Sequence, residues 1–208
     1  MREFIKKIVF KFLRFTRIDV NYFYNENFAT TELRDKRWVK DFCGLVLEIF
    51  HPKSLIDFGC GTGDILKPFE EKGIEVRGID ASLANKRHAK IKPENFQTYD
   101  LRNRYKALKR YDLCFCFEMA EHLQEKYSDI LIGNLTGASQ VVLFTAAIDP
   151  EGVDHVNLKP SSWWIEKFKK FGFEFDRQLT LLMKERMKTI SGIHSWYIEN
   201  LLIFKKAI

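Results

Sequence analysis

Two carboxylates and an imidazole lie close together in the stretch FEMAEHL. Glu118, Glu121 and His122 stand at positions i, i+3 and i+4, so they share one side if helical turns begin at Glu118. Such groups suit a divalent cation that orients and acidifies a hydroxyl, and imidazole can accept a proton near neutral pH. Alternatively, Glu121 has no chemical role and only stabilises the first turn of a helix, where an acidic side chain interacts favourably with the helix dipole. The spacing therefore leaves metal chemistry, proton transfer and a plain helix start open.

The stretch LIDFGCGTGDIL places an acidic residue before three alternating glycines, namely Asp57, Gly59, Gly61 and Gly63. Glycine is disfavoured inside strands and helices, so this spacing predicts a sharp strand-to-helix turn against which a ligand can lie. A dinucleotide-binding motif would have its third glycine at Asp64, and no Gly-Lys-Ser/Thr of a P-loop follows. The turn therefore favours a ligand without a phosphate at this point.

Short apolar runs alternate with helical segments from His51 onward. We predict strands at 54–59, 75–80, 96–100, 111–117 and 140–146, and helices near 32–50, 63–72, 82–90, 121–136 and 161–171. This alternation indicates an α/β fold with a mainly parallel sheet covered on both faces. Two further strand-like runs, 173–186 and 195–207, have no helical pattern between them and predict an antiparallel pair.

The basic residues are unevenly distributed. The net charge is +6, and residues 1–17 hold six basic residues against Glu3, so the rest of the chain is nearly neutral. This distribution argues against a nucleic-acid-binding surface. Apolar residues at helical spacing in 1–17 predict an amphipathic helix, which either packs on the domain or a second subunit or lies on an anionic membrane.

The four cysteines are not spaced as a disulfide framework, and no apolar run reaches the roughly 20 residues of a membrane span. We therefore expect a cytoplasmic protein, with membrane contact only through residues 1–17. The oligomeric state is left open.

The acidic-x-G-x-G-x-G turn, with acidic residues after the next two strands, resembles the class I S-adenosylmethionine-dependent methyltransferases over about residues 55–205. The resemblance implies a Rossmann-like sheet of seven strands in the order 3-2-1-4-5-7-6. It also implies S-adenosylmethionine as cofactor, with Asp80 accepting from the ribose hydroxyls and Asp100 from the adenine amino group. The cofactor-binding residues that it implies are Asp57, Gly59, Cys60, Gly61, Thr62, Gly63, Asp80, Ala81, Asp100, Leu101, Phe117 and Glu118.

The E-x-x-E-H stretch resembles a motif of O-methyltransferases that act on quinone rings and on the 3′ ends of small RNAs. There a distant ligand joins a magnesium or zinc site, and His155 in GVDHVNLKP is the candidate here. The resemblance implies Glu118, Glu121, His122 and His155 as metal ligands. Glu118, His122 and His155 are the candidate catalytic residues, and without a metal His122 or His155 serves as the general base.

We therefore expect an enzyme that methylates an oxygen of a small molecule or glycan, which could be lipid-linked. An RNA 3′-end 2′-O-methyltransferase and a non-catalytic S-adenosylmethionine-binding module are the alternatives. Residues 1–50 are expected to form N-terminal helices and a lid or substrate region, and residues 51–208 the methyltransferase domain.

Overall fold

The computed structural model describes residues 38–149 and 155–207. The predicted amphipathic helix at 1–17, and most of the predicted lid region, lie outside these residues. Among the residues described, no helix is both long and apolar enough to cross a bilayer.

Seven strands form one sheet in the order β3-β2-β1-β4-β5-β7-β6. The strands are β1 (Ser54–Phe58), β2 (Glu75–Asp80), β3 (Phe96–Thr98), β4 (Leu113–Cys116), β5 (Val141–Phe144), β6 (Phe173–Phe175) and β7 (Leu202–Lys206). The first five pair in parallel, whereas β7 is antiparallel to both β5 and β6. The predicted fold class and strand order are therefore confirmed.

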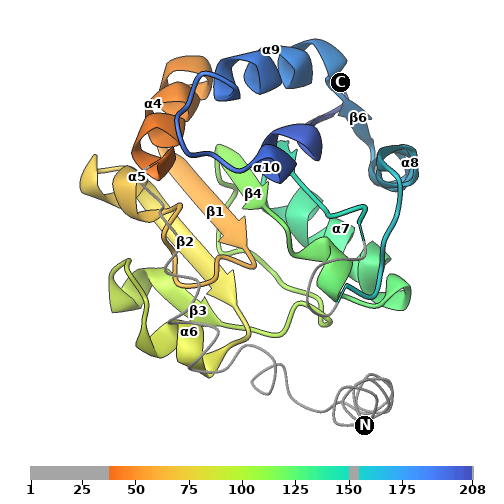
Figure 1. Cartoon of the computed structure of the whole chain (residues 1–208). Helices are drawn as coiled ribbons and strands as arrows, with labels where there is room; N and C mark the ends of the chain where they lie inside the picture. The colour runs from red at the N-terminus through yellow and green to blue at the C-terminus, as the bar shows by residue number, and fades with distance from the viewer. Residues whose placement is uncertain (1–37, 150–154, 208) are drawn as a thin grey trace, which may run out of the picture.

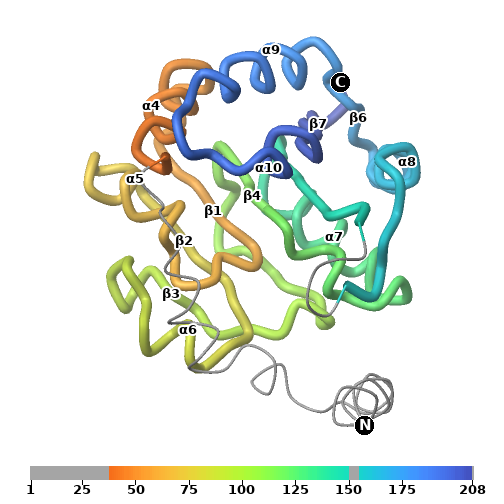
Figure 2. Tube along the Cα trace, viewed as in Figure 1, coloured from red at the N-terminus to blue at the C-terminus, as the bar shows by residue number. Residues whose placement is uncertain are grey.

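Helices cover both faces of the sheet (Figure 1). They are α4 (Trp38–Phe50), α5 (Lys67–Glu71), α6 (Leu83–Arg87), α7 (Ser128–Ala138), α8 (Ser161–Lys170), α9 (Arg177–Met187) and α10 (Ser195–Glu199). Short 3₁₀ turns lie at Pro93–Asn95, Ala120–His122 and Glu125–Tyr127. The tube in Figure 2 shows α4 and α9 side by side on one flank of the molecule, with α8 on the other.

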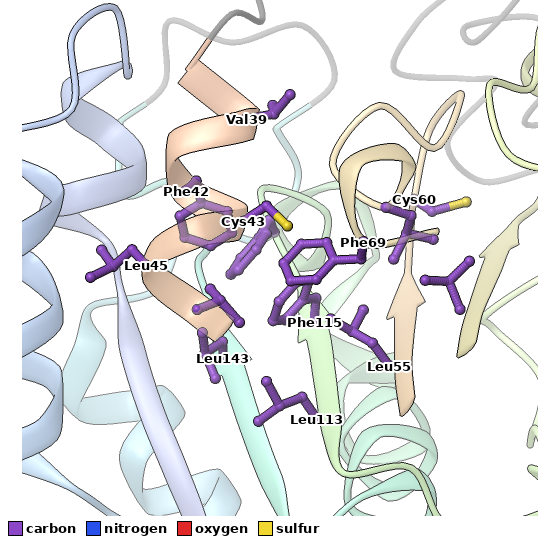
Figure 3. Close-up of a cluster of buried hydrophobic side chains, with 14 of the residues drawn as sticks. Val39, Phe42, Cys43, Leu45, Leu55, Cys60, Phe69, Leu113, Phe115 and Leu143 are labelled. Carbon is purple, nitrogen blue, oxygen red and sulfur yellow. The ribbon is translucent and has the colours of Figure 1, made fainter. Parts of the chain in front are cut away.

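The strands divide their apolar side chains between two cores because successive side chains point to opposite faces. In β4, Leu113 and Phe115 join the core beneath α4, α5 and α9, while Cys114 and Cys116 join the core beneath α7 and α8. Figure 3 shows the first core, where Phe42 and Cys43 of α4 face Phe69 and Phe115. All four cysteines are buried free thiols.

The second core is closed at the antiparallel end of the sheet. The rings of Phe168 in α8 and Phe204 in β7 are stacked, with centroids 3.7 Å apart and planes 9° apart. Trp164 is also buried there and contacts Phe144. Residues from the last strand thus hold α8 against β5.

The predicted strand at 173–186 is wrong beyond Phe175. Residues 177–187 form α9 instead, and the Asp176 side chain caps this helix by accepting from the backbone N–H of Leu179 at 2.9 Å. Thr180, Met183 and Met187 are its buried residues, at a spacing that only a helix brings to one side. A second helix, α10, precedes β7, so the expected strand at 195–207 is confirmed only from Leu202.

The expected helix at 121–136 begins later than predicted. The chain forms 3₁₀ turns at 120–122 and 125–127, and α7 starts at Ser128. Glu118 has a φ of +48°, which a helix does not allow. Glu118, Glu121 and His122 therefore do not share one helix side.

Candidate active site

The glycine turn follows β1 at the carboxyl edge of the sheet. Gly59, Gly61 and Gly63 have φ angles of +82°, +57° and +81°, a region that residues with a side chain rarely adopt. The N–H of Gly59 donates to the carbonyl oxygen of Ile79 at 2.8 Å, and the N–H of Gly61 donates to Oδ2 of Asp80 at 2.9 Å. These two bonds fix the turn to the end of β2.

Two of these glycines have different reasons for lacking a side chain. A Cβ at Gly59 would lie 2.3 Å from Cγ of Met119, so the methionine occupies that place. A Cβ at Gly61 would meet no described atom within 4 Å. The main chain at Gly61 is therefore open to a ligand, while Gly59 permits close packing against the segment after β4.

Asp57, two residues before Gly59, is a buried carboxylate, 2% exposed. Its Oδ1 accepts no hydrogen bond from the residues that the structure describes. Burial and the neighbouring Asp80 carboxylate raise the pKa of Asp57 to about 7. An unpaired acid of this kind indicates a place for a cationic group beside the turn.

The carboxylate of Asp80 ends β2 and organises the adjacent loop. Its Oδ1 accepts from the N–H of Ser82 at 2.8 Å and from Nδ2 of Asn85 at 3.1 Å. The predicted contact residue Ala81 lies between Asp80 and Ser82 and is half-buried. Asp80 thus connects the glycine turn to the start of α6.

Asp100 lies beyond β3 and is paired within the chain. Arg102 donates to it through Nε at 2.9 Å and through a terminal nitrogen at 2.7 Å. Leu101 between them is buried in the second core. An adenine amino group would therefore meet a carboxylate that already has a cationic partner.

The side chains of Cys60 and Thr62 belong to the turn's interior. Both residues are buried, and the Thr62 hydroxyl donates to the carboxylate of Asp64. Their backbone groups also bond within the protein: the N–H of Cys60 donates to the carbonyl oxygen of Ile79 at 3.2 Å, and the carbonyl oxygen of Thr62 accepts from the N–H of Lys90 at 2.8 Å.

Phe117 and Glu118 continue from β4 at the same edge of the sheet. Phe117 is buried and stacked on Phe115, with centroids 4.9 Å apart. The backbone N–H of Glu118 donates to Oγ1 of Thr145 at 2.8 Å, and Oε1 of Glu118 accepts from Nδ2 of Asn200 at 3.2 Å. Burial raises the pKa of Glu118, and the hydrogen bonds of Thr145 and Asn200 oppose that rise.

Glu121, His122 and His155 form a cluster. One ligand atom from each can be chosen so that all three lie within 4.8 Å of one another, and Glu118 is not a member of this group. The imidazole rings of His122 and His155 have centroids 5.1 Å apart. Nδ1 of His155 contacts the carbonyl oxygen of Asp149 at 2.8 Å, and a carbonyl only accepts, so Nδ1 carries a proton.

Glu121 is the buried member of this cluster. It is fully buried, and within the described part of the chain neither carboxylate oxygen has a hydrogen-bond partner. Burial and the charge of Glu118 raise the pKa of Glu121 to about 8. An unsatisfied buried carboxylate beside two imidazoles can hold a proton near neutral pH or bind a cation.

Three residues at this site were not predicted from the sequence. Met119 fills the space above Gly59, while Thr145 and Asn200 bond Glu118. The sequence places Met119 directly after Glu118, but nothing in it indicates that this methionine packs against Gly59. Thr145 follows β5 and Asn200 lies between α10 and β7, and only the pairing of β4 with β5 and of β5 with β7 brings these residues near the end of β4.

Known proteins of similar sequence and structure agree with the observed fold. Residues 31–136 match a family model described as a methyltransferase domain. A ubiquinone biosynthesis O-methyltransferase of Rhodopseudomonas palustris (strain BisA53) is 34% identical over 88 residues, which is 36% of this chain and 35% of that protein. The match thus spans about a third of the length of that curated relative.

Solved structures share the fold at lower identity. The sugar N-methyltransferase KedS8 of Streptoalloteichus has a TM-score of 0.63 at 14% identity, with 86% of this chain and 92% of that chain covered. CalS10, an amino pentose methyltransferase from Micromonospora echinaspora, has a TM-score of 0.62 at 14% identity, with 86% and 95% covered. The methyltransferase domain of bacterial CtHen1-C has a TM-score of 0.56 at 19% identity, with 81% and 97% covered.

The family model covers just over half of the chain, and the sheet order is the one that the glycine turn and its acidic partners led us to expect. The chain therefore belongs to the methyltransferase domain family and has the fold of the class I S-adenosylmethionine-dependent methyltransferases.

Proposed function

We propose that this protein transfers the methyl group of S-adenosylmethionine to a hydroxyl oxygen of a small molecule or glycan. The observation that carries the proposal is the cluster of Glu121, His122 and His155 at the carboxyl edge that also holds the glycine turn. A proton acceptor is what a hydroxyl needs before it can attack a methyl group. The O-methyltransferase that matches in part supports oxygen as the acceptor atom. The sugar N-methyltransferase KedS8 and the amino pentose methyltransferase CalS10, which share the fold, support a sugar as the acceptor molecule but not oxygen as the acceptor atom.

The residues of the turn fit S-adenosylmethionine. The cofactor has a cationic ammonium group and no phosphate, which suits the unpaired Oδ1 of buried Asp57. Open space at Gly61 leaves room for the cofactor against the main chain, and Asp80 stands at the end of the next strand. The carboxylate of Asp100, which already accepts from Arg102, would also have to accept from the adenine amino group.

When bound, S-adenosylmethionine supplies a methyl group made electrophilic by a positively charged sulfur. Asp57, Gly61 and Asp80 would hold the cofactor, and it would give its methyl carbon to the acceptor oxygen as the carbon–sulfur bond breaks, with S-adenosylhomocysteine as the product. We assign the hydroxyl proton to Nε2 of His155, because the contact with the Asp149 carbonyl holds the proton of the neutral ring on Nδ1. Most of the rate gain comes from holding the groups in line.

A divalent cation is a second candidate at the same cluster. Glu121, His122 and His155 offer one carboxylate and two imidazoles, a ligand set that suits zinc and accepts magnesium less readily. A bound cation would acidify the acceptor hydroxyl in place of a base. Loss of transfer after dialysis against EDTA, restored by one added metal, would identify the cation; undiminished transfer would assign the cluster to proton transfer alone.

The proposal is tested in two steps. Isothermal titration with S-adenosylmethionine must show binding. At a protein concentration near 50 µM the titration detects a binding free energy of about −6 kcal/mol or more favourable, and absence of measurable heat there would refute the proposal. Release of S-adenosylhomocysteine is then followed with a panel of phenols, catechols and sugars. His122→Ala and His155→Ala, made separately, should lose transfer yet bind cofactor, and full transfer by both would remove them from the mechanism.

Transfer to RNA 3′ ends is the alternative, and the small RNA methyltransferase HEN1, which has a similar fold (TM-score 0.55 at 14% identity), is the observation that favours it. It predicts RNA affinity that falls steeply with salt, because phosphate contacts release counterions. The near-neutral charge beyond residue 17 opposes it. A non-catalytic cofactor-binding module would bind S-adenosylmethionine but release no S-adenosylhomocysteine with any acceptor.

A further inference from the structure

The segment that ends in α10 lies at the edge of the sheet that holds the candidate active site. Leu202, the first residue of β7, pairs with Phe144, the last residue of β5. Because β7 is antiparallel to β5, the chain just before Leu202 lies where the parallel strands end. Asn200 confirms this placement through its 3.2 Å hydrogen bond to Glu118. Figure 1 shows α10 beside β4.

Aromatic rings connect the end of β4 to the surface of this segment. The ring of Tyr197 lies 6.2 Å from that of Phe117, and the ring of Trp196 lies 6.3 Å from that of Tyr197. His194 is stacked on Trp196, with centroids 4.2 Å apart and planes 5° apart. The series therefore runs from a buried ring at the candidate site to rings at the surface.

The outer end of this series is exposed although it is apolar. Trp196 is 38% exposed, whereas Trp38 and Trp164 are 3% and 1% exposed. His194 covers one face of the indole in parallel and fixes its orientation without burying it. A large aromatic side chain that is oriented but not buried can stack on a ring of a ligand at a small cost in ordering.

We propose that Trp196, supported by His194, is the platform on which the methyl acceptor stacks, and that the acceptor therefore has a ring with an apolar face. This inference rests on the proposed function. The ring is either an aromatic ring or the apolar face of a sugar, since both pack on indole.

Saturation-transfer difference NMR on the full chain with S-adenosylhomocysteine tests the platform. Catechol serves as the aromatic probe and methyl β-D-glucopyranoside as the sugar probe. We expect saturation of the ring protons of one probe, and the probe that responds distinguishes the two ring classes. Trp196→Ala should lower the signal about five- to tenfold, equivalent to roughly 1–1.4 kcal/mol of stacking, whereas Trp196→Phe should keep most of it.

Two further variants complete the test. Leu182→Ala removes an exposed apolar side chain of α9, 49% exposed, and should leave the signal unchanged. His194→Ala keeps the indole but removes its support, and we expect a loss of about threefold. This variant decides the question if Trp196→Ala does not fold by circular dichroism.

Equal signals from wild type and from both the Trp196→Ala and His194→Ala variants would overturn the platform, as would the absence of saturation transfer to either probe. Titration of S-adenosylhomocysteine on the same samples separates the two proposals. Intact cofactor-product binding with lost ring binding supports the platform. If the wild type does not bind S-adenosylhomocysteine, the proposed function fails, and the ring signals of the variants still decide the platform.

Discussion

Replacement of Asp57 by Asn tests the electrostatics of the glycine turn. The carboxyl of Asp57 is buried, and its pKa lies at about 7 against an ordinary value of 3.8. Between these pH values the folded state keeps a proton that the unfolded chain has already released. Rising pH therefore disfavours the folded state, and the stability is lost as pH passes through about 7.

The magnitude follows from this difference. A change from 3.8 to about 7 corresponds to at most about 4 kcal/mol, at 1.36 kcal/mol for each pH unit. The free energy of unfolding of wild type should fall by up to this amount, relative to Asp57→Asn, between pH 4 and pH 8. The variant's amide does not titrate, so any fixed cost of burying it shifts its curve without changing the slope.

Urea unfolding followed by circular dichroism at half-unit steps from pH 4 to pH 8 measures the two curves. Titration with S-adenosylhomocysteine gives a second readout, because its ammonium group binds an ionised Asp57 best. Wild-type affinity should rise with pH up to about 7 relative to Asp57→Asn. If the wild-type and Asp57→Asn curves run parallel with pH, both for stability and for S-adenosylhomocysteine affinity, Asp57 is not the unpaired acid that binds the ammonium group.

Three further variants test other parts of the site. Gly59→Ala should destabilise the fold by about 2–4 kcal/mol in urea unfolding, because Gly59 has a positive φ and an added Cβ would clash with Met119. Adding Met119→Ala to this variant should recover part of the lost stability, and no recovery would contradict the steric reason. Asn200→Ala should shift the pH profile of transfer upward by removing a bond that stabilises ionised Glu118, and an unchanged profile would show that Glu118 does not act in its charged form. His155→Gln should abolish metal-independent transfer with unchanged S-adenosylhomocysteine affinity by titration, and weakened affinity would place His155 at the cofactor instead.

Most of the sheet could be predicted because its strands are short apolar runs separated by helical patterns. The glycine turn then fixed the first strand and the edge at which a ligand binds. The C-terminal part was harder, because Phe173–Arg186 is rich in residues that suit either state. The helix there is set by the Asp176 cap and by the buried positions Thr180, Met183 and Met187. Their helical spacing can be read in the sequence, but the apolar residues of the same stretch favour the prediction of a strand.

The candidate site was predictable in its residue types but not in its grouping. A helix starting at Glu118 would have joined Glu118 to Glu121 and His122, whereas the positive φ of Glu118 turns the chain there. Glu118 instead meets Asn200, 82 positions later, a contact that no local pattern contains. The roles of these residues in binding and transfer stay predictions.

The position of β7 between β5 and β6 has a consequence for synthesis on the ribosome. β6 pairs with β7 and not with β5, so it has no place in the sheet until the later strand has emerged. Until then β5 is an open edge, and Phe168 lacks the ring of Phe204 on which it stacks. The nascent chain therefore exposes an apolar edge strand and an unstacked ring until β7 has been synthesised, and such exposed surface favours aggregation or chaperone binding before that point.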